Sequence, residues 1–505
     1  SKIQANNTNS VIVQRPTIDG NHFVGSWIFR LVIDNPTTVT LQNNITAGNG
    51  GLSFLNAGNF DLNGNTLTLG DGAAFSISGG GAGRILGTGV GSRVITQGTG
   101  TLDGNRFTAN VVANLTINGA GTNTTTLVNN LTIGTALDLP SAMRTLVLGN
   151  PSQLTIPTAT MIAGPGLINA QGAGSTVVWS PITFPADRFV NKTLFNLTIN
   201  SPVNVTLTNA AGTPLVIGGA LTMQGAGHFG VFTAGTMNYL RLLNGATLNI
   251  PSTGRLAINQ MNSGIEVQAA GLNANALLNN QVMDLQINRA TNVQLAGALN
   301  LLGNLTIPNT GNFDLNGSTL TFTASSSIGA LMGRVDAQAA GSHVIYQLAA
   351  LNPANFVANT FQNLTIDRAA GVTASASAII IGTLNFAVSN GSMDMGMNTL
   401  ILENLAAITQ MGIGRVNFTA GGIAEIRTAT LNGNWFTANQ VPILRLNRTM
   451  PGNIALTNNL GAFTQLQLMN GIVNTAVGSA VTLANTATVM GGSATSHING
   501  PMERD

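Results

Sequence analysis

The stretch from Gly58 to Gly70 reads GNFDLNGNTLTLG, and the stretch from Gly311 to Phe322 repeats it almost unchanged as GNFDLNGSTLTF. The two phrases lie 253 residues apart in one chain. Near-identical phrases at a long, fixed distance are typical of repeat proteins, in which one structural unit is copied and stacked. This recurrence therefore predicts a repeat architecture.

A second phrase sets the length of the repeat. The tetrapeptide NLTI recurs along the chain, and an aromatic residue often precedes it by seven positions. The pairing defines six anchor positions in the chain: Phe23, Phe107, Phe189, Leu277, Phe356 and Phe436. Successive anchors are separated by roughly 80 to 88 residues, a period that indicates six imperfect repeats. The distance between the two near-identical phrases corresponds to three of these repeats.

We expect a single continuous solenoid over residues 1–505. Its repeats are predicted at approximately 10–92, 93–175, 176–263, 264–341, 342–422 and 423–496. Residues 497–505 resemble the opening of a further repeat.

The local pattern predicts short β-strands. Within the first repeat, apolar residues alternate in segments such as LVI from Leu31, VTL from Val39 and LTL from Leu67, and Asn, Gly, Asp and Pro separate them. Alternation with period two is a strand signal, and the separating residues are turn formers. The strands recur about every 7 to 9 residues, which leaves no room for crossover helices. We therefore expect an all-β fold.

Two all-β architectures fit these strands. One is a string of β-sandwich domains of about 80 residues, in which Asn-Gly forms hairpin turns. The other is a right-handed parallel β-helix with about three strands and roughly 22 residues per coil, so that each repeat holds roughly four coils. The three tryptophans cannot supply a core to six domains, and no linker-like segment separates the repeats. Asn-Gly and other Asn-rich segments also suit coil corners, where left-handed residues are needed and Asn side chains can stack. The sequence favours the β-helix.

Composition limits the functions that are possible. Charged residues make up 7% of the chain, the formal net charge is +2, and Lys2 and Lys192 are the only lysines, so the basic footprint of a nucleic-acid-binding protein is missing. There is no cysteine, which excludes disulfides and thiolate metal sites. Apolar runs such as AIIIG from Ala378 are too short to span a bilayer, so no membrane span is expected.

The phrases NLTIN, FDLNGNTLTLG and SHINGPMERD together resemble the β-strand-repeat surface proteins that gliding and related bacteria export through the type IX secretion system. The resemblance covers essentially the whole chain. It implies a cell-surface or extracellular fibre, adhesin or stalk, with the secretion machinery as a partner. The C-terminal sorting domain of that family's full-length plan does not follow Asp505, so export by this route is an expectation from the resemblance alone.

No catalytic, cofactor-binding or metal-binding set is predicted. Asp61, Asp314 and Asp394 recur at one position of the repeat, and a single acid per repeat indicates turn structure more than a Ca²⁺ site. The four histidines are scattered, and none stands in a zinc or Ser/His/Asp arrangement. We therefore expect neither an enzyme nor a cofactor.

Two series of arginines keep their position in the repeat. One series follows a glycine and precedes an apolar strand, and the other follows an NLTI-like strand: Arg84, Arg255, Arg334 and Arg415 in the first, and Arg289, Arg368 and Arg448 in the second. If the repeats stack in line, each series forms a file with one guanidinium about every 19 Å, which could contact an anionic polysaccharide or a neighbouring molecule. The alternative interpretation is that each arginine binds backbone carbonyls at a corner.

These features together predict an extracellular structural or adhesive surface protein, a stiff rod that presents repeated weak contacts to surface glycans or to itself. One alternative is a subunit that assembles into filaments through its sides or ends. The other, of a different class, is a β-helix protein that binds or degrades polysaccharide.

Overall fold

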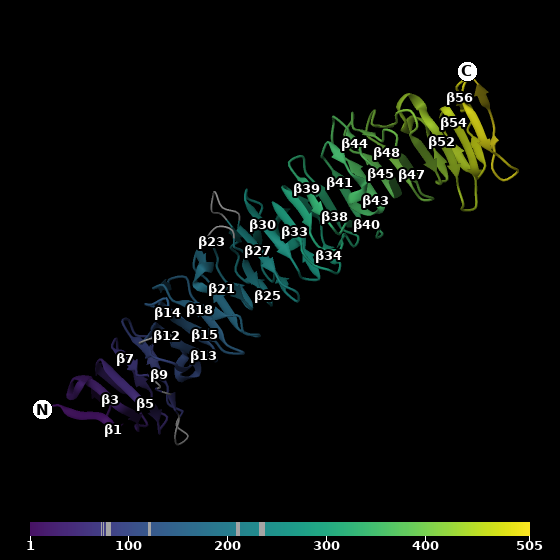
Figure 1. Cartoon of the computed structure of the whole chain (residues 1–505). Coiled ribbons are helices and arrows are strands. Elements are labelled where there is room, and N and C mark those ends of the chain that lie inside the picture. The colour runs from purple at the N-terminus through teal and green to yellow at the C-terminus, as the bar shows by residue number, and fades with distance from the viewer. Residues whose placement is uncertain are drawn as a thin grey trace. The chain divides into compact units, whose positions relative to one another are not determined.

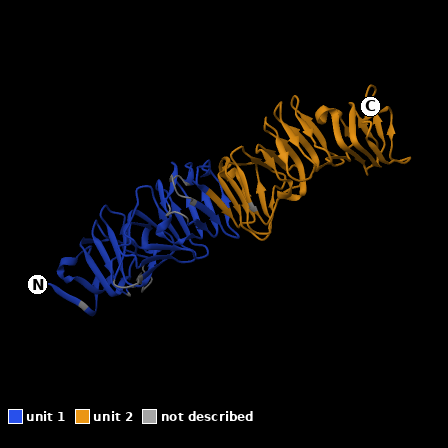
Figure 2. Cartoon of the chain, turned by 45° about the horizontal axis from the view of Figure 1, so that its top comes forward, with its two compact units in different colours: residues 1–263 blue, residues 264–505 orange. Residues whose placement is uncertain are grey.

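The computed structural model describes residues 1–71, 73, 75–76, 82–119, 123–208, 213–231 and 238–504. The chain divides into two compact units, unit 1 with residues 1–263 and unit 2 with residues 264–505 (Figure 2). β30 (Ser263–Val267) crosses this division.

Both units consist of short strands stacked in parallel, and together they make about 22 turns of β-solenoid (Figure 1). The predicted all-β, parallel β-helix is confirmed. Register partners in adjacent turns lie about 20 to 24 residues apart, as Leu364 with Leu384 and Leu384 with Ile408 show. Parallel pairing also excludes the sandwich interpretation, because hairpin turns would place consecutive strands antiparallel.

Three strands make one turn, so each unit has three sides. The chain passes from side 1 to side 2 to side 3 within each turn, and the first strand of unit 1 begins on side 2. Long strands bend at a corner and belong to two sides.

Side 1 of unit 1 contains β2 (Thr17–Asp19), β4 (Val39–Asn43), β6 (Phe60–Asp61), β9 (Ile85–Gly87), β16 (Gln153–Ile156), β19 (Thr176–Trp179), β22 (Asn196–Ile199), β25 (Ala220–Met223), β28 (Thr247–Asn249) and the first parts of β12 (Phe107–Asn118) and β14 (Leu131–Asp138). Side 2 contains β7 (Thr66–Leu69), β10 (Arg93–Gln97), β17 (Met161–Ala163), β20 (Thr183–Pro185), β23 (Val205–Thr208), β26 (Phe229–Val231), β29 (Leu256–Ile258), the last parts of β12 and β14, and the first parts of β1 (Ile3–Val13), β3 (Phe23–Ile33) and β5 (Ile45–Phe54). Side 3 contains β8 (Phe75–Ser76), β11 (Gly100–Asp103), β13 (Asn123–Val128), β15 (Arg144–Leu148), β18 (Leu167–Ala170), β21 (Phe189–Leu194), β24 (Leu215–Ile217), β27 (Asn238–Leu242) and the last parts of β1, β3 and β5.

Unit 2 has the same construction. Its side 1 contains β31 (Gly271–Asn273), β34 (Val293–Ala296), β37 (Phe313–Asp314), β40 (Val335–Ala337), β47 (Thr399–Leu402), β50 (Ile423–Ile426), β57 (Thr488–Gly491), the first parts of β43 (Phe356–Ile366) and β45 (Ala378–Phe386), and the last parts of β52 (Gln440–Asn447) and β54 (Leu460–Asn470). Side 2 contains β32 (Leu277–Val282), β35 (Leu299–Leu301), β38 (Thr319–Phe322), β41 (His343–Tyr346), β48 (Ala407–Gln410), β51 (Thr430–Leu431), β53 (Ile454–Leu456), β55 (Val473–Thr475), β58 (Ile498–Asn499) and the last parts of β43 and β45. Side 3 contains β33 (Asp284–Ile287), β36 (Asn304–Ile307), β39 (Ser327–Leu331), β42 (Ala350–Leu351), β44 (Val372–Ala374), β46 (Ser392–Asp394), β49 (Arg415–Asn417), β56 (Val481–Leu483), β59 (Met502–Arg504) and the first parts of β52 and β54.

The core of each unit lies inside the turns. Alternate residues of a strand face inward, so that strands such as β36 and β38 show one buried residue after each partly exposed one. The anchor residues of the repeats are all part of this core, with exposed fractions of 5% or less. Stacked apolar rows of this kind stabilise a solenoid because each turn covers its neighbours.

A single turn of 3-10 helix precedes each anchor. The six turns are η1 (Gly20–His22), η2 (Gly104–Arg106), η3 (Ala186–Arg188), η4 (Ala274–Ala276), η5 (Pro353–Asn355) and η6 (Gly433–Trp435), and η7 (Thr437–Asn439) follows the last anchor. An Asp or Asn side chain caps every one of the six except η3, where Pro185 takes that position. The structure thus shows that a 3-10 turn recurs once in each repeat, directly before the anchor.

Successive repeats begin on different sides of the solenoid. In unit 2, Leu277 opens a strand of side 2, Phe356 pairs with Val335 on side 1, and Phe436 pairs with Val416 on side 3. The reason is that eleven strands, β32 to β42, separate η4 from η5, which is three and two-thirds turns at three strands per turn. The predicted count of roughly four coils per repeat is therefore a third of a turn too high.

The same offset occurs in unit 1. Phe23 pairs with Ile3 on side 2, Phe107 pairs with Ile85 on side 1, and β21, which begins at Phe189, pairs with β18 on side 3. In each unit, the anchors of three consecutive repeats therefore lie on the three different sides.

Asparagines at the corners join successive turns, as the Asn-rich corners predict. Asn292 Oδ1 accepts a hydrogen bond of 3.1 Å from the backbone N–H of Asn312, and Asn312 Oδ1 accepts one of 2.9 Å from the N–H of Arg334. At two Asn-Gly corners both residues are left-handed, with φ of 47° and 79° at Asn63 and Gly64 and of 46° and 77° at Asn316 and Gly317. Asn and Gly are suited to such corners because they adopt this region at little cost.

Candidate functional site

The arginines selected from the sequence do not form files. In unit 1, Arg84 precedes a strand of side 1, whereas Arg255 precedes a strand of side 2. In unit 2, Arg334 precedes a strand of side 1, whereas Arg415 begins a strand of side 3. The fractional number of turns per repeat rotates equivalent residues by a third of a turn, and the prediction of aligned guanidinium groups is wrong for this reason.

The second series is dispersed in the same way. Arg289 follows a strand of side 3, Arg368 one of side 2 and Arg448 one of side 1. Each of the three nevertheless makes the same contact, because its Nη1 donates to the backbone carbonyl of the residue 21 positions earlier in the chain. The donor–acceptor distances are 3.3, 3.4 and 3.0 Å. These arginines therefore tie one turn to the turn before it.

The first series also contacts backbone carbonyls. Arg255 Nη1 lies 2.9 Å from the carbonyl oxygen of Ser252, Arg334 Nη1 lies 2.7 Å from that of Ala354, and Arg415 Nη1 lies 2.8 Å from that of Gly414. The side chain of Arg84 is exposed and makes no hydrogen bond with the residues that the structure describes. Most of the selected arginines thus bind backbone carbonyls at corners, as the alternative interpretation predicts.

The recurrent aspartates brace turns. The Oδ1 atoms of Asp61, Asp314 and Asp394 accept hydrogen bonds of 2.9, 2.8 and 3.0 Å from the backbone N–H two residues later. Each is an Asx-turn, which agrees with the turn structure that the sequence indicated. Among the described residues, no group of three or more His, Asp or Glu could hold a metal ion.

The densest cluster of charges was not predicted. Glu425 lies on the outward face of side 1 in unit 2, and its side chain is 5% exposed. Arg427 Nε and Arg445 Nη1 donate to its carboxylate at 2.7 and 3.0 Å, and Arg427 Nη1 also contacts Glu403 at 2.7 Å. Asn447 donates to Glu425 as well, at 2.9 Å. We call Glu403, Glu425, Arg427 and Arg445 the charge cluster.

A sequence signal for the charge cluster exists in hindsight. Glu403 and Arg427 lie 24 residues apart, and Glu425 and Arg445 lie 20 residues apart, which is one turn in each case. Opposite charges at the spacing of one turn on the same side lie next to each other in a parallel stack. Pairs of opposite charges at the spacing of a turn, and not of a repeat, are the sequence pattern that predicts such contacts.

Hydrogen bonding keeps Glu425 ionised. Burial alone would raise the pKa of this carboxyl, but the hydrogen bonds from Asn447, Arg427 and Arg445 and the positive charge of Arg427 outweigh it, so that the pKa lies below the ordinary value. Both carboxylates and both guanidiniums of the cluster are paired. A carboxylate held in this way is a poor general acid.

A groove lies beside the charge cluster on the outward face of side 1. Its volume is about 510 Å³, and its lining includes Ile379, Ile381, Leu405, Met450, Glu403 and Asn404. Leu405 and Met450 are 80% and 49% exposed, so the apolar part of the lining is open to solvent. The size is sufficient for a small ligand or a segment of a polymer.

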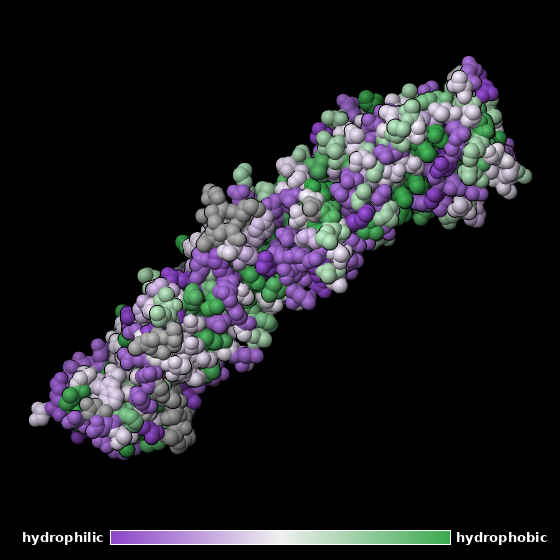
Figure 3. Space-filling view, viewed as in Figure 1, coloured by the Kyte–Doolittle hydropathy of each residue, from purple (hydrophilic) through white to green (hydrophobic). Residues whose placement is uncertain are grey.

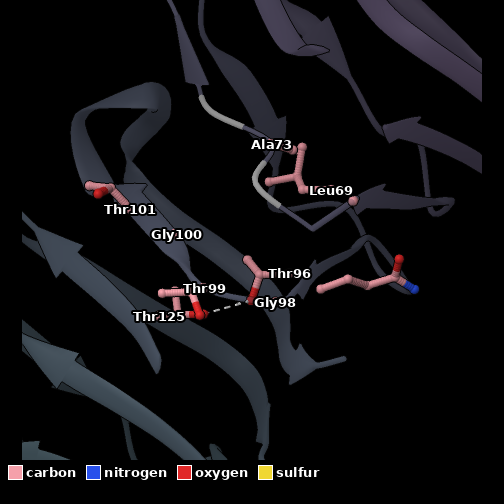
Figure 4. A pocket seen from close by; sticks show the side chains of 10 residues that line it. Leu69, Ala73, Thr96, Gly98, Thr99, Gly100, Thr101 and Thr125 are labelled. Atoms are coloured by element: carbon pink, nitrogen blue, oxygen red, sulfur yellow. Dashed lines mark hydrogen bonds between the residues drawn. The ribbon is translucent and has the colours of Figure 1, made fainter. Parts of the chain in front are cut away.

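A second cavity, in unit 1, is much smaller. Its volume is about 10 Å³, and Leu69, Ala73, Thr96 and Thr125 contribute to its lining (Figure 4). The hydroxyls of Thr96 and Thr125 lie 3.1 Å apart and satisfy each other. A space of about this volume holds one water molecule, so it cannot hold a substrate.

The structure defines the protein as a β-solenoid repeat protein. No protein-family model matches the chain, and no curated protein or solved structure shows significant similarity to it. In the part of the chain that the structure describes, no helix has the length and apolar character needed to cross a membrane.

Proposed function

We propose that this chain is an extracellular or cell-surface structural protein that acts by adhesion through many weak contacts. The observation that carries the proposal is the rotation of successive repeats, because equivalent surface elements then point in three directions within each unit. Many weak contacts at high effective concentration give firm attachment without a deep pocket. Export through the type IX secretion system and contacts with surface glycans or with further copies of the chain belong to this proposal.

The surface composition supports it. Figure 3 shows hydrophilic and hydrophobic residues interspersed over the visible face. Exposed apolar residues such as Met143, Met261, Met397 and Ile413 occur in both units, each with at least 60% of its surface accessible. Scattered apolar side chains in a polar, weakly charged surface favour numerous small contacts over one strong interface.

The test combines imaging with binding. Electron microscopy of the full-length chain at low and high concentration is expected to show particles of one size, and a glycan array followed by titration calorimetry is expected to give several weak sites per chain. Long filaments at high concentration would favour the self-assembling subunit. A single tight site per chain would contradict the adhesive proposal.

The groove beside the charge cluster favours a second candidate, a protein that binds or degrades polysaccharide. Glu403 and Asn404 would supply polar contacts to a sugar chain, and Ile379 and Ile381 an apolar floor. Incubation with acidic and neutral polysaccharides should then release reducing sugars or unsaturated products, and Glu403→Gln should reduce that release. If the protein binds polysaccharide, Glu403→Gln abolishes this binding and no sugar product forms, the chain binds polysaccharide without degrading it.

A further inference from the structure

Asn-Gly corners recur along the chain, and this dipeptide is the one most prone to spontaneous deamidation. The backbone nitrogen of glycine attacks Cγ of the preceding asparagine, and the small glycine leaves this approach open. The reaction needs a free, deprotonated glycine nitrogen and a backbone that can bend toward the side chain. Hydrogen bonding of the glycine N–H therefore decides which corners react.

At two of the corners a serine hydroxyl accepts a hydrogen bond from the glycine N–H, and we call these the locked corners. The N–H of Gly64 donates to Ser92 Oγ at 3.0 Å, and the N–H of Gly317 donates to Ser342 Oγ at 3.0 Å. Ser92 and Ser342 come from the following turn, and both are fully buried at 0% exposure. A second hydrogen bond stabilises each corner, because Asp61 and Asp314 accept hydrogen bonds from the backbone N–H groups of the corner asparagines, Asn63 and Asn316. Both corners belong to the two near-identical phrases at 58–70 and 311–322.

A third corner has no such lock. Asn244 and Gly245 are both exposed, and neither makes a hydrogen bond with the residues that the structure describes. The space around Gly245 is open, since a Cβ built on it would have no atom within 4 Å. Its φ of 88° is left-handed, as at the locked corners. The same dipeptide thus occurs in one chain with and without a serine acceptor.

We propose that Asn244-Gly245 is a site of spontaneous deamidation and that Ser92 and Ser342 protect Asn63-Gly64 and Asn316-Gly317 from the same reaction. At Asn244, the nitrogen of Gly245 forms a bond to Cγ, the bond from Cγ to the side-chain nitrogen breaks, and ammonia leaves. Water then opens the resulting succinimide to aspartate or isoaspartate. The net change is the addition of water and the loss of ammonia, with no oxidant or enzyme.

The consequence differs between the sites. Each deamidation adds one negative charge to a chain whose formal net charge is only +2. At the exposed corner the new carboxylate remains in water. At the locked corners, isoaspartate would lengthen the backbone within a turn that neighbouring turns contact on both faces, so the two serines preserve the stacking of the solenoid.

The test is incubation of the full-length protein in mildly alkaline buffer, followed by peptide mapping with mass spectrometry that separates aspartate from isoaspartate. We expect Asn244 to deamidate at least about tenfold faster than Asn63 and Asn316 in the same sample. Equal rates at the three sites, or a slower rate at Asn244, would overturn the proposal.

A serine variant separates the lock from general stability. Ser342→Ala is expected to accelerate deamidation of Asn316 by roughly fivefold or more, which corresponds to the loss of one ordinary hydrogen bond. Asn63 in the same variant is the internal control, because a general loosening of the protein would accelerate it as well. Ser326→Ala, which removes another buried hydroxyl of unit 2 that bonds to Thr323, is the matched control and should leave Asn316 unchanged. An unchanged rate at Asn316 in Ser342→Ala would refute the protective role.

Discussion

Glu425 joins two neighbouring turns of unit 2, because it contacts Arg427 of its own turn and Arg445 and Asn447 of the following turn. It is the most buried member of the charge cluster, and its carboxylate accepts hydrogen bonds from arginines of its own turn and of the following turn. Loss of this carboxylate leaves Arg445 without a charged partner and Arg427 with Glu403 alone, which costs more than an exposed ion pair contributes. At the scale of single residues, this cluster is where we expect the largest electrostatic effect.

The pH dependence of unit 2 should report on Glu425. Because its pKa in the folded protein is lowered, its stabilisation is fully present above the ordinary value of 4.5 and is lost as the pH falls through the folded-state pKa. Glu425→Gln should lower the free energy of unfolding at neutral pH by about 1 to 3 kcal/mol and flatten its decline in acid. Urea unfolding measured over an acid pH series tests this. The exposed Glu503→Gln is the control, and a decline in Glu425→Gln as steep as in the unmodified protein would contradict the assignment.

The corner arginines make a second prediction at this scale. Arg368→Ala removes the donor to the carbonyl of Gln347 and should cost about 1 kcal/mol, since one charge-assisted hydrogen bond between turns is lost. Arg84→Ala is the matched control from the other arginine series, because its exposed side chain makes no such bond among the described residues, and its effect should lie within about 0.5 kcal/mol. Thermal unfolding of both variants measures the difference, and equal effects would show that the carbonyl contact contributes nothing.

At the scale of elements, the 3-10 turn and its anchor form the unit that recurs. The anchor inserts a large apolar side chain into the core immediately after a capped turn, and Phe356 is fully buried against Phe361 at a ring-centroid distance of 4.5 Å. The repeat supplies its own natural variant, because Leu277 occupies the same position in another copy. The position therefore requires apolar volume more than aromaticity.

Substitution at this anchor tests that requirement. Phe356→Leu should cost less than about 1.5 kcal/mol, because the apolar volume is largely kept. Phe356→Ala should cost about 3 to 5 kcal/mol, because it leaves a cavity in a closely packed core. Urea unfolding of the two variants gives the ratio. Similar losses for both would mean that the aromatic ring itself, through its contacts with neighbouring rings, is what the position needs.

At the scale of the whole molecule, the number of strands per repeat decides which surfaces are equivalent. A repeat of three and two-thirds turns returns to the same side only after three copies. The two near-identical phrases of the sequence lie three repeats apart, at β6 and β37, and each is found on side 1 of its own unit. We infer that the chain keeps its closest sequence similarity between copies that occupy the corresponding place in their own units.

The turn, rather than the repeat, should be the unit of folding. Deletion of residues 365–384 removes one full turn of unit 2, because Leu364 and Leu384 are register partners, and this variant should remain folded. A deletion of residues 365–374 removes half a turn and should not fold, because every following strand would then be displaced by half a turn from its register partners. Circular dichroism and limited proteolysis distinguish the two. Equal tolerance of both deletions would contradict the register.

Much of this architecture could be predicted from the sequence. Period-two alternation in segments such as β7 and β38, together with Asn and Gly at corners, determined the parallel β-solenoid, because strand faces and left-handed corners depend on local residue types. The recurrence of NLTI and the aromatic anchors located the elements that the structure shows as capped 3-10 turns.

What only the tertiary structure decided is which distant residues share a side. The length of a repeat does not show that it holds three and two-thirds turns instead of four, so Arg334 and Arg415 were expected to align and lie on different sides in the structure. The charge cluster could not be predicted for a related reason. Glu403 lies 24 residues from Arg427 and Glu425 lies 20 residues from Arg445, so the contacts depend on the exact length of each turn. Local chemistry determines strands and corners, whereas the closure of the turns determines the contacts between them.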